Sequence, residues 1–261
     1  MKPPAYLTDL FGLSGSTSVV IGGTGVLGGG FARTLAAAGS HVFICGRGEA
    51  AGLDTAETIA EAGGSAEVFT LDATVRDDLR SLADDLARRD LRCDVLVNAA
   101  GMNAATPFLE IPDEEWDAIL RVNLNSVRLG CEVFGAGMVE AGTGSIINVA
   151  SMSAVTPLSK VFTYSVSKAA VLNLTKNLAR EWAPAGVRVN AISPGFFPAE
   201  QNREVLTPDR VESIMNHTPM RRFGEPEELA GGLLLLASTK AGAFVTGTNL
   251  CVDGGFSAMT I

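Results

Sequence analysis

The sequence predicts a single α/β domain built on a doubly wound parallel sheet of about seven strands. Short β-rich runs alternate with longer helical stretches, and parallel neighbouring strands require such crossover connections. The runs are apolar on both faces, as at Val95, Leu96 and Val97, which is typical of strands that helices cover on both sides. A length of 261 residues suits one large domain and would crowd two.

Each predicted strand is a short run rich in apolar and β-branched residues, and the intervals between the runs are long enough for helices. No Pro/Ser linker and no internal repeat divides the chain, so a single domain, 1–261, is expected. One long interruption, at about 195–226, contains a helical stretch at 208–217. Because it follows the carboxyl end of a strand, we expect it to form a substrate lid. The predicted strands are 18–21, 41–45, 66–71, 93–98, 145–149, 187–192 and 248–252.

Composition excludes several classes of protein. Hydrophobic residues make up 47% of the chain and charged residues 19%, with 29 glycines spread along it, which favours a compact enzyme over a disordered segment. The net charge of −9 is not offset by any basic run, so nucleic acid is not an expected partner. The first 18 residues contain no continuous apolar segment, and the leucine run at 233–237 is too short to span a bilayer. We therefore expect a cytoplasmic protein that acts on a small molecule and does not bind a membrane.

The four cysteines are far apart in the chain, and three of them lie in or near apolar strand-like runs. This pattern predicts buried, reduced thiols, in preference to a disulfide or a zinc site. No metal is therefore expected. The cysteines are Cys45, Cys93, Cys131 and Cys251.

A glycine-rich turn follows the first predicted strand and leads into a helix. Gly23, Gly25 and Gly28 match the pattern G-x-G-x-x-G. Glycine lets backbone N–H groups approach a pyrophosphate, whose charge the helix N-terminus favours. A turn needed only for packing is the alternative, but the position between strand and helix favours dinucleotide binding. The residues predicted to contact the dinucleotide here are Gly22, Gly23, Thr24, Gly25, Val26, Leu27 and Gly28.

The second predicted strand ends at Cys45-Gly46-Arg47, without the carboxylate that would accept hydrogen bonds from an adenosine ribose. Gly46 leaves room for a 2′-phosphate and Arg47 could bind it bidentately, so NADP is expected in preference to NAD. Arg47 could instead be a solvated surface residue. Asp72, followed by Ala73, ends the third strand and could accept from the adenine amino group or cap the next helix.

Four polar residues suggest acid/base chemistry. Tyr164 and Lys168 are four residues apart in a predicted helix, so the phenol and the ammonium share a face. A free tyrosine titrates near ~10, and a nearby cation would stabilise its phenolate. Ser151 stands just past the strand 145–149, where its hydroxyl could bond a carbonyl oxygen, and Asn123 lies in a helical stretch that disfavours asparagine. Each could otherwise be an ordinary surface or loop residue.

Taken together, these motifs resemble the short-chain dehydrogenase/reductase family in order and spacing over nearly the whole chain. The resemblance implies a Rossmann-type fold, an NAD(P) cofactor, and hydride transfer between the nicotinamide and a ketone or secondary alcohol. It implies that Tyr164 is the acid/base, that Lys168 binds the nicotinamide ribose and lowers the pKa of Tyr164, that Ser151 orients the carbonyl, and that Asn123 holds a proton-relay water. Further cofactor contacts that it implies are Asn98, Ala99, Ala100, Gly101, Tyr164, Lys168, Pro194, Gly195 and Phe197.

The chain also departs from the family pattern. Ile21 and Val26 replace a threonine and a glycine of the usual turn, with Gly25 supplying a shifted glycine. Ala199 stands where a threonine often contacts the carboxamide, which puts that one contact in doubt.

Segments around the expected site resemble a sugar-acid branch of the family, the D-mannonate oxidoreductases (fructuronate reductases). We therefore expect a keto group or alcohol of a sugar acid as substrate. Gluconate 5-dehydrogenase and 3-oxoacyl-carrier-protein reductase activities stay open, as does, more remotely, a non-catalytic nucleotide-binding role. The resemblance also implies a homotetramer in which the Tyr164 helix and its predecessor pack across a two-fold axis. The candidate substrate contacts are Ser151, Asn103, Lys160 and Arg203, of which Lys160 and Arg203 could bind a carboxylate or be solvated surface charges.

Overall fold

A seven-stranded parallel sheet forms the centre of the computed structural model, which describes residues 5–197 and 207–259. The strand order is β3-β2-β1-β4-β5-β6-β7. From β1 the chain adds β2 and β3 on one side, and it then crosses back to add β4 to β7 on the other side of β1. This confirms the predicted fold class, including the number of strands. The strands are β1 (Thr17–Ile21), β2 (His41–Gly46), β3 (Ser65–Thr70), β4 (Val95–Asn98), β5 (Gly144–Val149), β6 (Val187–Pro194) and β7 (Asn249–Val252).

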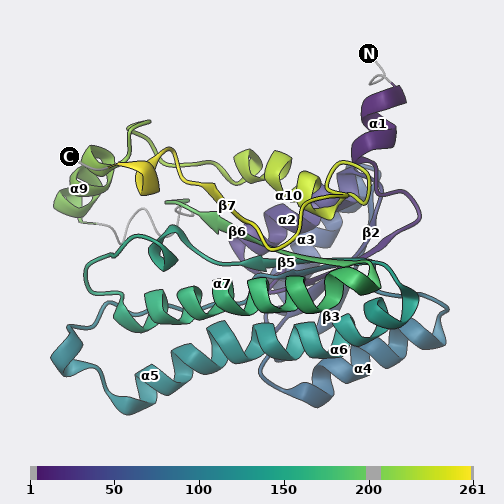
Figure 1. Cartoon of the computed structure of the whole chain (residues 1–261), viewed down its shortest axis with the longest axis horizontal. Helices are drawn as coiled ribbons and strands as arrows, with labels where there is room; N and C mark the ends of the chain where they lie inside the picture. The colour runs from purple at the N-terminus through teal and green to yellow at the C-terminus, as the bar shows by residue number, and fades with distance from the viewer. Residues whose placement is uncertain (1–4, 198–206, 260–261) are drawn as a thin grey trace.

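Helices cover both faces of the sheet (Figure 1). On one face lie α2, α3 and α10, and on the other lie α4, α6 and α7, with α5 leading into α6. The helices are α1 (Ala5–Phe11), α2 (Val26–Ala37), α3 (Glu49–Glu61), α4 (Arg76–Arg88), α5 (Asp113–Leu120), α6 (Ser126–Ala141), α7 (Phe162–Trp182), α9 (Pro208–His217) and α10 (Ala230–Ala237), with short 3₁₀ turns η1 (Phe108–Glu110), η3 (Met152–Ala154), η4 (Ala183–Ala185), η5 (Pro226–Leu229) and η6 (Phe256–Ala258), and a π-helical turn η2 (Arg121–Asn125).

Alternation along the strands divides the core between these two layers. In β1, Val19 and Ile21 pack into the cluster beneath α4, α6 and α7, whereas Val20 packs into the cluster beneath α2 and α10. All three side chains are at most 1% exposed. Successive side chains of a strand point to opposite faces, so strands buried on both sides must be apolar throughout.

The register brings the carboxyl ends of the central strands to one edge of the sheet. Ile21 pairs with both Cys45 and Asn98, and Asn98 pairs with Asn148. Open α/β sheets bind ligands outside this edge, at the point where the strand order reverses. Here that point lies between β1 and β4, so the segments that follow these strands and β5 are placed to form a site.

Most of the predicted elements are confirmed, with boundaries displaced by at most two residues. The helical stretch 208–217 is α9, and it lies beside the carboxyl-terminal turn η6, where the rings of His217 and Phe256 are 4.6 Å apart (Figure 1). The π-helical turn η2 was not predicted. All four cysteines are free, three of them buried, as expected.

Within the ranges described, no helix is long and apolar enough to cross a membrane, and no group of acidic, cysteine or histidine side chains could hold a metal ion. The cytoplasmic location stays a prediction.

Candidate active site

A cavity of about 470 Å³ at the carboxyl edge of the sheet brings together residues from six separate parts of the chain. Tyr164 and Lys168 come from α7 and Ser151 from the end of β5. Of the other residues predicted for the site, the cavity is also lined by Gly22, Gly25, Val26, Leu27, Gly28, Ala99, Gly101, Asn103, Pro194, Gly195 and Phe197.

A second cavity, of about 360 Å³, adjoins the first and shares four lining residues with it. These are Gly22, Gly25, Ala99 and Gly101, so the glycine turn separates the two spaces. An elongated ligand would therefore lie across the glycine turn. The remaining predicted cofactor residues that line the second cavity are Thr24, Arg47, Asp72, Ala73 and Ala100.

Ser151 and Tyr164 are in contact inside the larger cavity. Burial raises the pKa of the Tyr164 phenol above its ordinary value, and a hydrogen bond with Ser151 acts in the opposite direction. The Ser151 hydroxyl in turn accepts hydrogen bonds from the backbone N–H of Ser153 at 3.2 Å and from its Oγ at 3.1 Å. Sequence reasoning missed Ser153, whose only signal was its position two residues after Ser151. Ser153 fixes the orientation of the hydroxyl that contacts the phenol.

Lys168 is buried, with 3% of its surface exposed, and its ammonium bonds a backbone carbonyl group. Its Nζ donates to the carbonyl oxygen of Val149 at 2.7 Å and lies 5.7 Å from the centroid of the Tyr164 ring. Burial lowers the pKa of Lys168 to about 8. The predicted proximity of the two groups is confirmed, but the predicted lowering of the Tyr164 pKa is wrong for this structure, because burial outweighs other influences on the phenol.

Asn123 is fully buried in the π-helical turn η2, and its amide is engaged by the protein itself. Its Oδ1 accepts from the backbone N–H of Met102 at 2.8 Å, while Nδ2 donates to the Met102 carbonyl at 2.9 Å and to Ser167 Oγ at 3.1 Å. Both amide protons are therefore used. These contacts tie the loop after β4 to α7, and the predicted hold on a relay water stays a prediction. π-helical turns often mark functional sites.

Two residues that were predicted to contact the cofactor, Asn98 and Gly23, face the core of the protein. Asn98, 2% exposed, donates to Asn148 Oδ1 at 2.8 Å, and Asn148 donates to Thr175 of α7 at 2.9 Å. This chain of bonds connects β4, β5 and α7. A Cβ on Gly23 would lie 2.9 Å from the Val20 oxygen and 3.0 Å from Ile44 Cγ2, so that glycine serves packing.

The glycine turn fits a dinucleotide pyrophosphate. No side chain caps the N-terminus of α2, and its first three residues, Val26, Leu27 and Gly28, line the larger cavity. Uncapped N–H groups at a helix start are suited to binding phosphate. At Gly25 an added Cβ would meet nothing closer than the Gly22 oxygen at 3.4 Å, so the space above this residue is open for a ligand.

The turn also allows its packing and binding roles to be separated by mutation. A Cβ on Gly28 would lie 2.0 Å from the Gly22 oxygen, so we expect Gly28→Ala to destabilise the fold by roughly 3 kcal/mol or more in urea unfolding. Gly25→Ala should unfold within about 1 kcal/mol of wild type, because that site is sterically open and its φ of −91° suits alanine. Gly25→Ala should nevertheless weaken NADPH binding in a fluorescence titration. Unchanged NADPH binding by that variant would favour a turn that serves packing alone.

The second cavity is lined by two arginines. The exposed Arg47 is there as predicted, and Arg121, which sequence reasoning missed, lines it from the start of η2. Gly46 also lines this cavity, where a Cβ on it would lie 2.4 Å from Thr24 Oγ1, so a side chain at this position would meet Thr24. Asp72 also lines the cavity; its Oδ1 accepts from the N–H and hydroxyl of Thr74, which lowers the pKa of Asp72.

The predicted substrate residues differ in whether they line the larger cavity. Asn103 lines the larger cavity, whereas Lys160 is exposed and does not line it, so its role in substrate binding stays a prediction. Arg203 and Ala199 fall outside the described residues. Of the predicted lid, the structure describes 195–197 and 207–226, and from this part Arg210 of α9 reaches the cavity lining. Nothing in the local sequence distinguished Arg210, because its position depends on how α9 docks.

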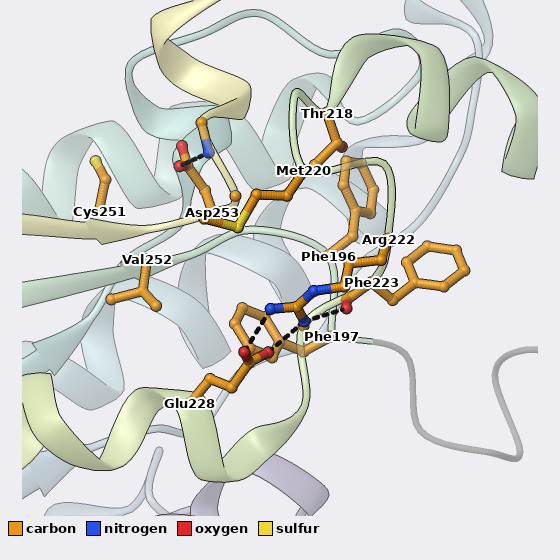
Figure 2. Close-up of a pocket in the computed structure, with 13 residues that line it drawn as sticks. Phe196, Phe197, Thr218, Met220, Arg222, Phe223, Glu228, Cys251, Val252 and Asp253 are labelled. Carbon is orange, nitrogen blue, oxygen red and sulfur yellow. Dashed lines mark hydrogen bonds and ion pairs between the residues drawn. The ribbon is translucent and has the colours of Figure 1, made fainter.

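A further cavity, of about 390 Å³, is shown in Figure 2, and Phe196 and Phe197 line both it and the larger cavity. Its charged groups already have partners. Arg222 pairs with both carboxylate oxygens of Glu228, at 2.6 and 2.7 Å, and Asp253 accepts two backbone N–H groups at 2.9 Å. Because these charged groups are already paired within the protein, we assign them a structural role.

Comparisons with known proteins agree with this geometry. Residues 24–257 match the family model described as enoyl-(acyl carrier protein) reductase. The 2-dehydro-3-deoxy-D-gluconate 5-dehydrogenase of Bacillus subtilis (strain 168) is 36% identical, over 96% of this chain and 98% of its own. The galactitol 2-dehydrogenase (L-tagatose-forming) of Cereibacter sphaeroides is 37% identical, over 95% and 97%.

Solved structures are similar over the same length. A gluconate 5-dehydrogenase from Burkholderia cenocepacia J2315, in complex with NADP and tartrate, has a TM-score of 0.92 at 31% identity and covers 97% of this chain and 100% of its own. A putative D-mannonate oxidoreductase from Haemophilus influenza with bound NAD has a TM-score of 0.91 at 32% identity, covering 97% and 99%. The chain therefore belongs to the short-chain dehydrogenase/reductase family of NAD(P)-dependent oxidoreductases.

Proposed function

We propose that this enzyme interconverts a keto group and a secondary alcohol on a sugar acid, of the D-fructuronate/D-mannonate type. The observation that carries the proposal is the contact between Tyr164 and Ser151 in a cavity that continues across the glycine turn. Relatives named for gluconate derivatives and for D-mannonate support a sugar-acid substrate.

The residues of the cavity are suited to proton transfer at the substrate oxygen. When bound, the nicotinamide supplies or accepts the hydride. In the reducing direction Tyr164 donates its phenolic proton to the oxygen of the substrate, where negative charge develops. The Ser151 hydroxyl, oriented by Ser153, donates a hydrogen bond to the same oxygen. The Lys168 ammonium, anchored on Val149, offsets part of the cost that burial adds to forming the phenolate that remains.

Arg47 is our candidate for recognising a 2′-phosphate, and this makes NADP the preferred cofactor. The second cavity presents Arg47 and Arg121 beside one carboxylate, Asp72. Loss of one charge-assisted contact to phosphate should weaken binding by roughly 10- to 30-fold. We expect Arg47→Ala to raise the Kd of NADPH by that factor and to change the Kd of NADH less than 2-fold, as measured by fluorescence titration. An equal loss for both cofactors, or tighter NADH binding by the wild type, would contradict the preference.

The substrate is tested with a panel followed at the nicotinamide absorbance. It contains D-mannonate, D-gluconate and 2-dehydro-3-deoxy-D-gluconate with either oxidised cofactor, and 3-oxoacyl and enoyl thioesters with either reduced cofactor. Gluconate 5-dehydrogenase activity is the nearest alternative, supported by the similar solved structure, and acyl reduction is supported by the name of the matching family model. Turnover of thioesters without turnover of sugar acids would end the sugar-acid proposal.

We also propose that the enzyme is a homotetramer, in which α6, α7 and the turn η2 contribute to a two-fold interface. An open groove lies between η2 and α7, with Leu120, Leu124 and Leu174 among its lining residues. Apolar side chains along such a groove suit an isologous contact. Multi-angle light scattering tests this directly, and a monomer at micromolar concentration would contradict it.

A further inference from the structure

We infer that Arg210, on α9, binds the carboxylate of the substrate and so selects sugar acids over neutral polyols. The inference rests on the proposed function and adds the residue that recognises the charged end of the substrate. The names of relatives do not decide between acids and polyols, since both kinds occur among them. The charges that line the cavity of this chain favour the acid.

Within 5–197 and 207–259, the charged residues that line the larger cavity are both cations, Lys168 and Arg210. No aspartate or glutamate of these ranges lines it, although the chain as a whole carries a net charge of −9. Lys168 is already committed, since its Nζ bonds the Val149 oxygen beside the Tyr164 ring. Among the lining residues that the structure describes, Arg210 is therefore the cation left to receive an anionic part of the substrate.

Arg210 is half-buried, and in the described part of the chain its guanidinium has no hydrogen-bond or ion-pair partner. Its acidic neighbours on α9, Asp209 and Glu212, are exposed and line an adjoining groove. Arg210 lines this groove as well as the larger cavity, and because its guanidinium is unpaired with these carboxylates it is placed to bind an external anion. A guanidinium matches a carboxylate with two parallel hydrogen bonds, which fixes orientation as well as charge.

The helix that carries Arg210 packs on the carboxyl-terminal turn through its last residues. Ile214 of α9 is buried, Thr218 Oγ1 donates to the Ile214 oxygen at 2.8 Å, and the His217 ring packs on Phe256 at 4.6 Å. A binding group on a fixed helix can hold one end of a substrate while the reacting carbon lies at Tyr164. Phe196, which lines both the cavity and the groove beneath α9, connects the two.

The test uses pairs of substrates that differ only in the carboxylate. D-mannonate is compared with D-mannitol, and D-gluconate with D-glucitol, each with NADP or NAD. We expect Arg210→Met to lower kcat/KM for the acids by about 30- to 100-fold, chiefly through KM, with kcat within about 3-fold. Polyol oxidation and the Kd of NADPH should change less than 3-fold. Arg210→Lys keeps the charge without the bidentate geometry and should lose about 5- to 10-fold.

Lys176→Met is the matched control, because it removes an exposed cation that does not line the cavity and was not assigned to the site. It should leave kcat/KM for the acids within 2-fold. The inference alone is overturned if the wild type oxidises sugar acids and Arg210→Met keeps their KM, or loses acid and polyol turnover equally. A wild-type enzyme that turns over no sugar acid overturns the proposed function and the inference together.

Discussion

Tyr164→Phe should lower kcat by at least about 10³-fold while leaving the Kd of NADPH within 2-fold of wild type. A positioned proton donor contributes roughly 10²- to 10⁴-fold to a rate, and the phenol that contacts Ser151 in this cavity is our proposed donor. Phenylalanine keeps the ring and its packing, and Ser151 keeps its bonds to Ser153. The measurement is steady-state turnover of the best substrate of the panel, with cofactor binding followed by fluorescence.

Thr163→Val is the matched control for that variant. Thr163 precedes Tyr164 in α7, is 2% exposed, and its hydroxyl has no hydrogen-bond partner in the described part of the chain. Valine keeps its shape and removes an unsatisfied buried hydroxyl, so stability should rise slightly and kcat should stay within 2-fold. Unchanged cellular function of Tyr164→Phe would instead favour a nucleotide-binding role without catalysis, whereas more than a tenth of wild-type turnover would show that Tyr164 is not the proton donor.

The fold was predictable because its signals are local. Runs such as Val95 to Val97 are apolar on both faces, and this pattern by itself indicates a parallel sheet between two helical layers. The turn from Gly22 to Gly28 was recognisable for a similar reason. Gly22 adopts a φ of +83°, and a Cβ on Gly28 would overlap the Gly22 backbone, so the conformation itself requires glycine.

The site was predictable only where spacing along one element determines position. Tyr164 and Lys168 share a helix, so their proximity follows from the helical repeat, and the structure confirms it. The direction of the Tyr164 pKa depends on burial by elements distant in sequence, and that prediction was wrong. The cation at the substrate end of the cavity could not be predicted for the same reason. Nothing in the local sequence distinguishes Arg210 from other cations such as Lys160, and only the docking of α9 places Arg210 at the cavity.

Lys168→Met should abolish most activity and yet stabilise the folded protein at pH 7. Without the ammonium beside the phenol we expect kcat/KM to fall by roughly 10²-fold or more. Burial lowers the pKa of Lys168 from its ordinary 10.5 to about 8, which corresponds to a cost of about 3 kcal/mol for folding with the charge inside. Methionine avoids that cost and loses the bond to the Val149 oxygen, worth about 1 kcal/mol. The net expectation is a gain of about 2 kcal/mol in urea unfolding at pH 7.

The pH dependence of this difference identifies its cause. Below pH 8 the lysine is protonated in both the folded and the unfolded chain, so the full cost of burying the charge is present. Between pH 8 and pH 10.5 the unfolded chain binds more protons than the folded one, and the stability of the wild type rises relative to Lys168→Met. By pH 10 the advantage of the variant should have largely disappeared. Lys176→Met, which removes an exposed lysine from the same helix, should show no such change between the two pH values. A stability difference between wild type and Lys168→Met that is equal at pH 7 and pH 10 would show that the buried ammonium carries no such cost.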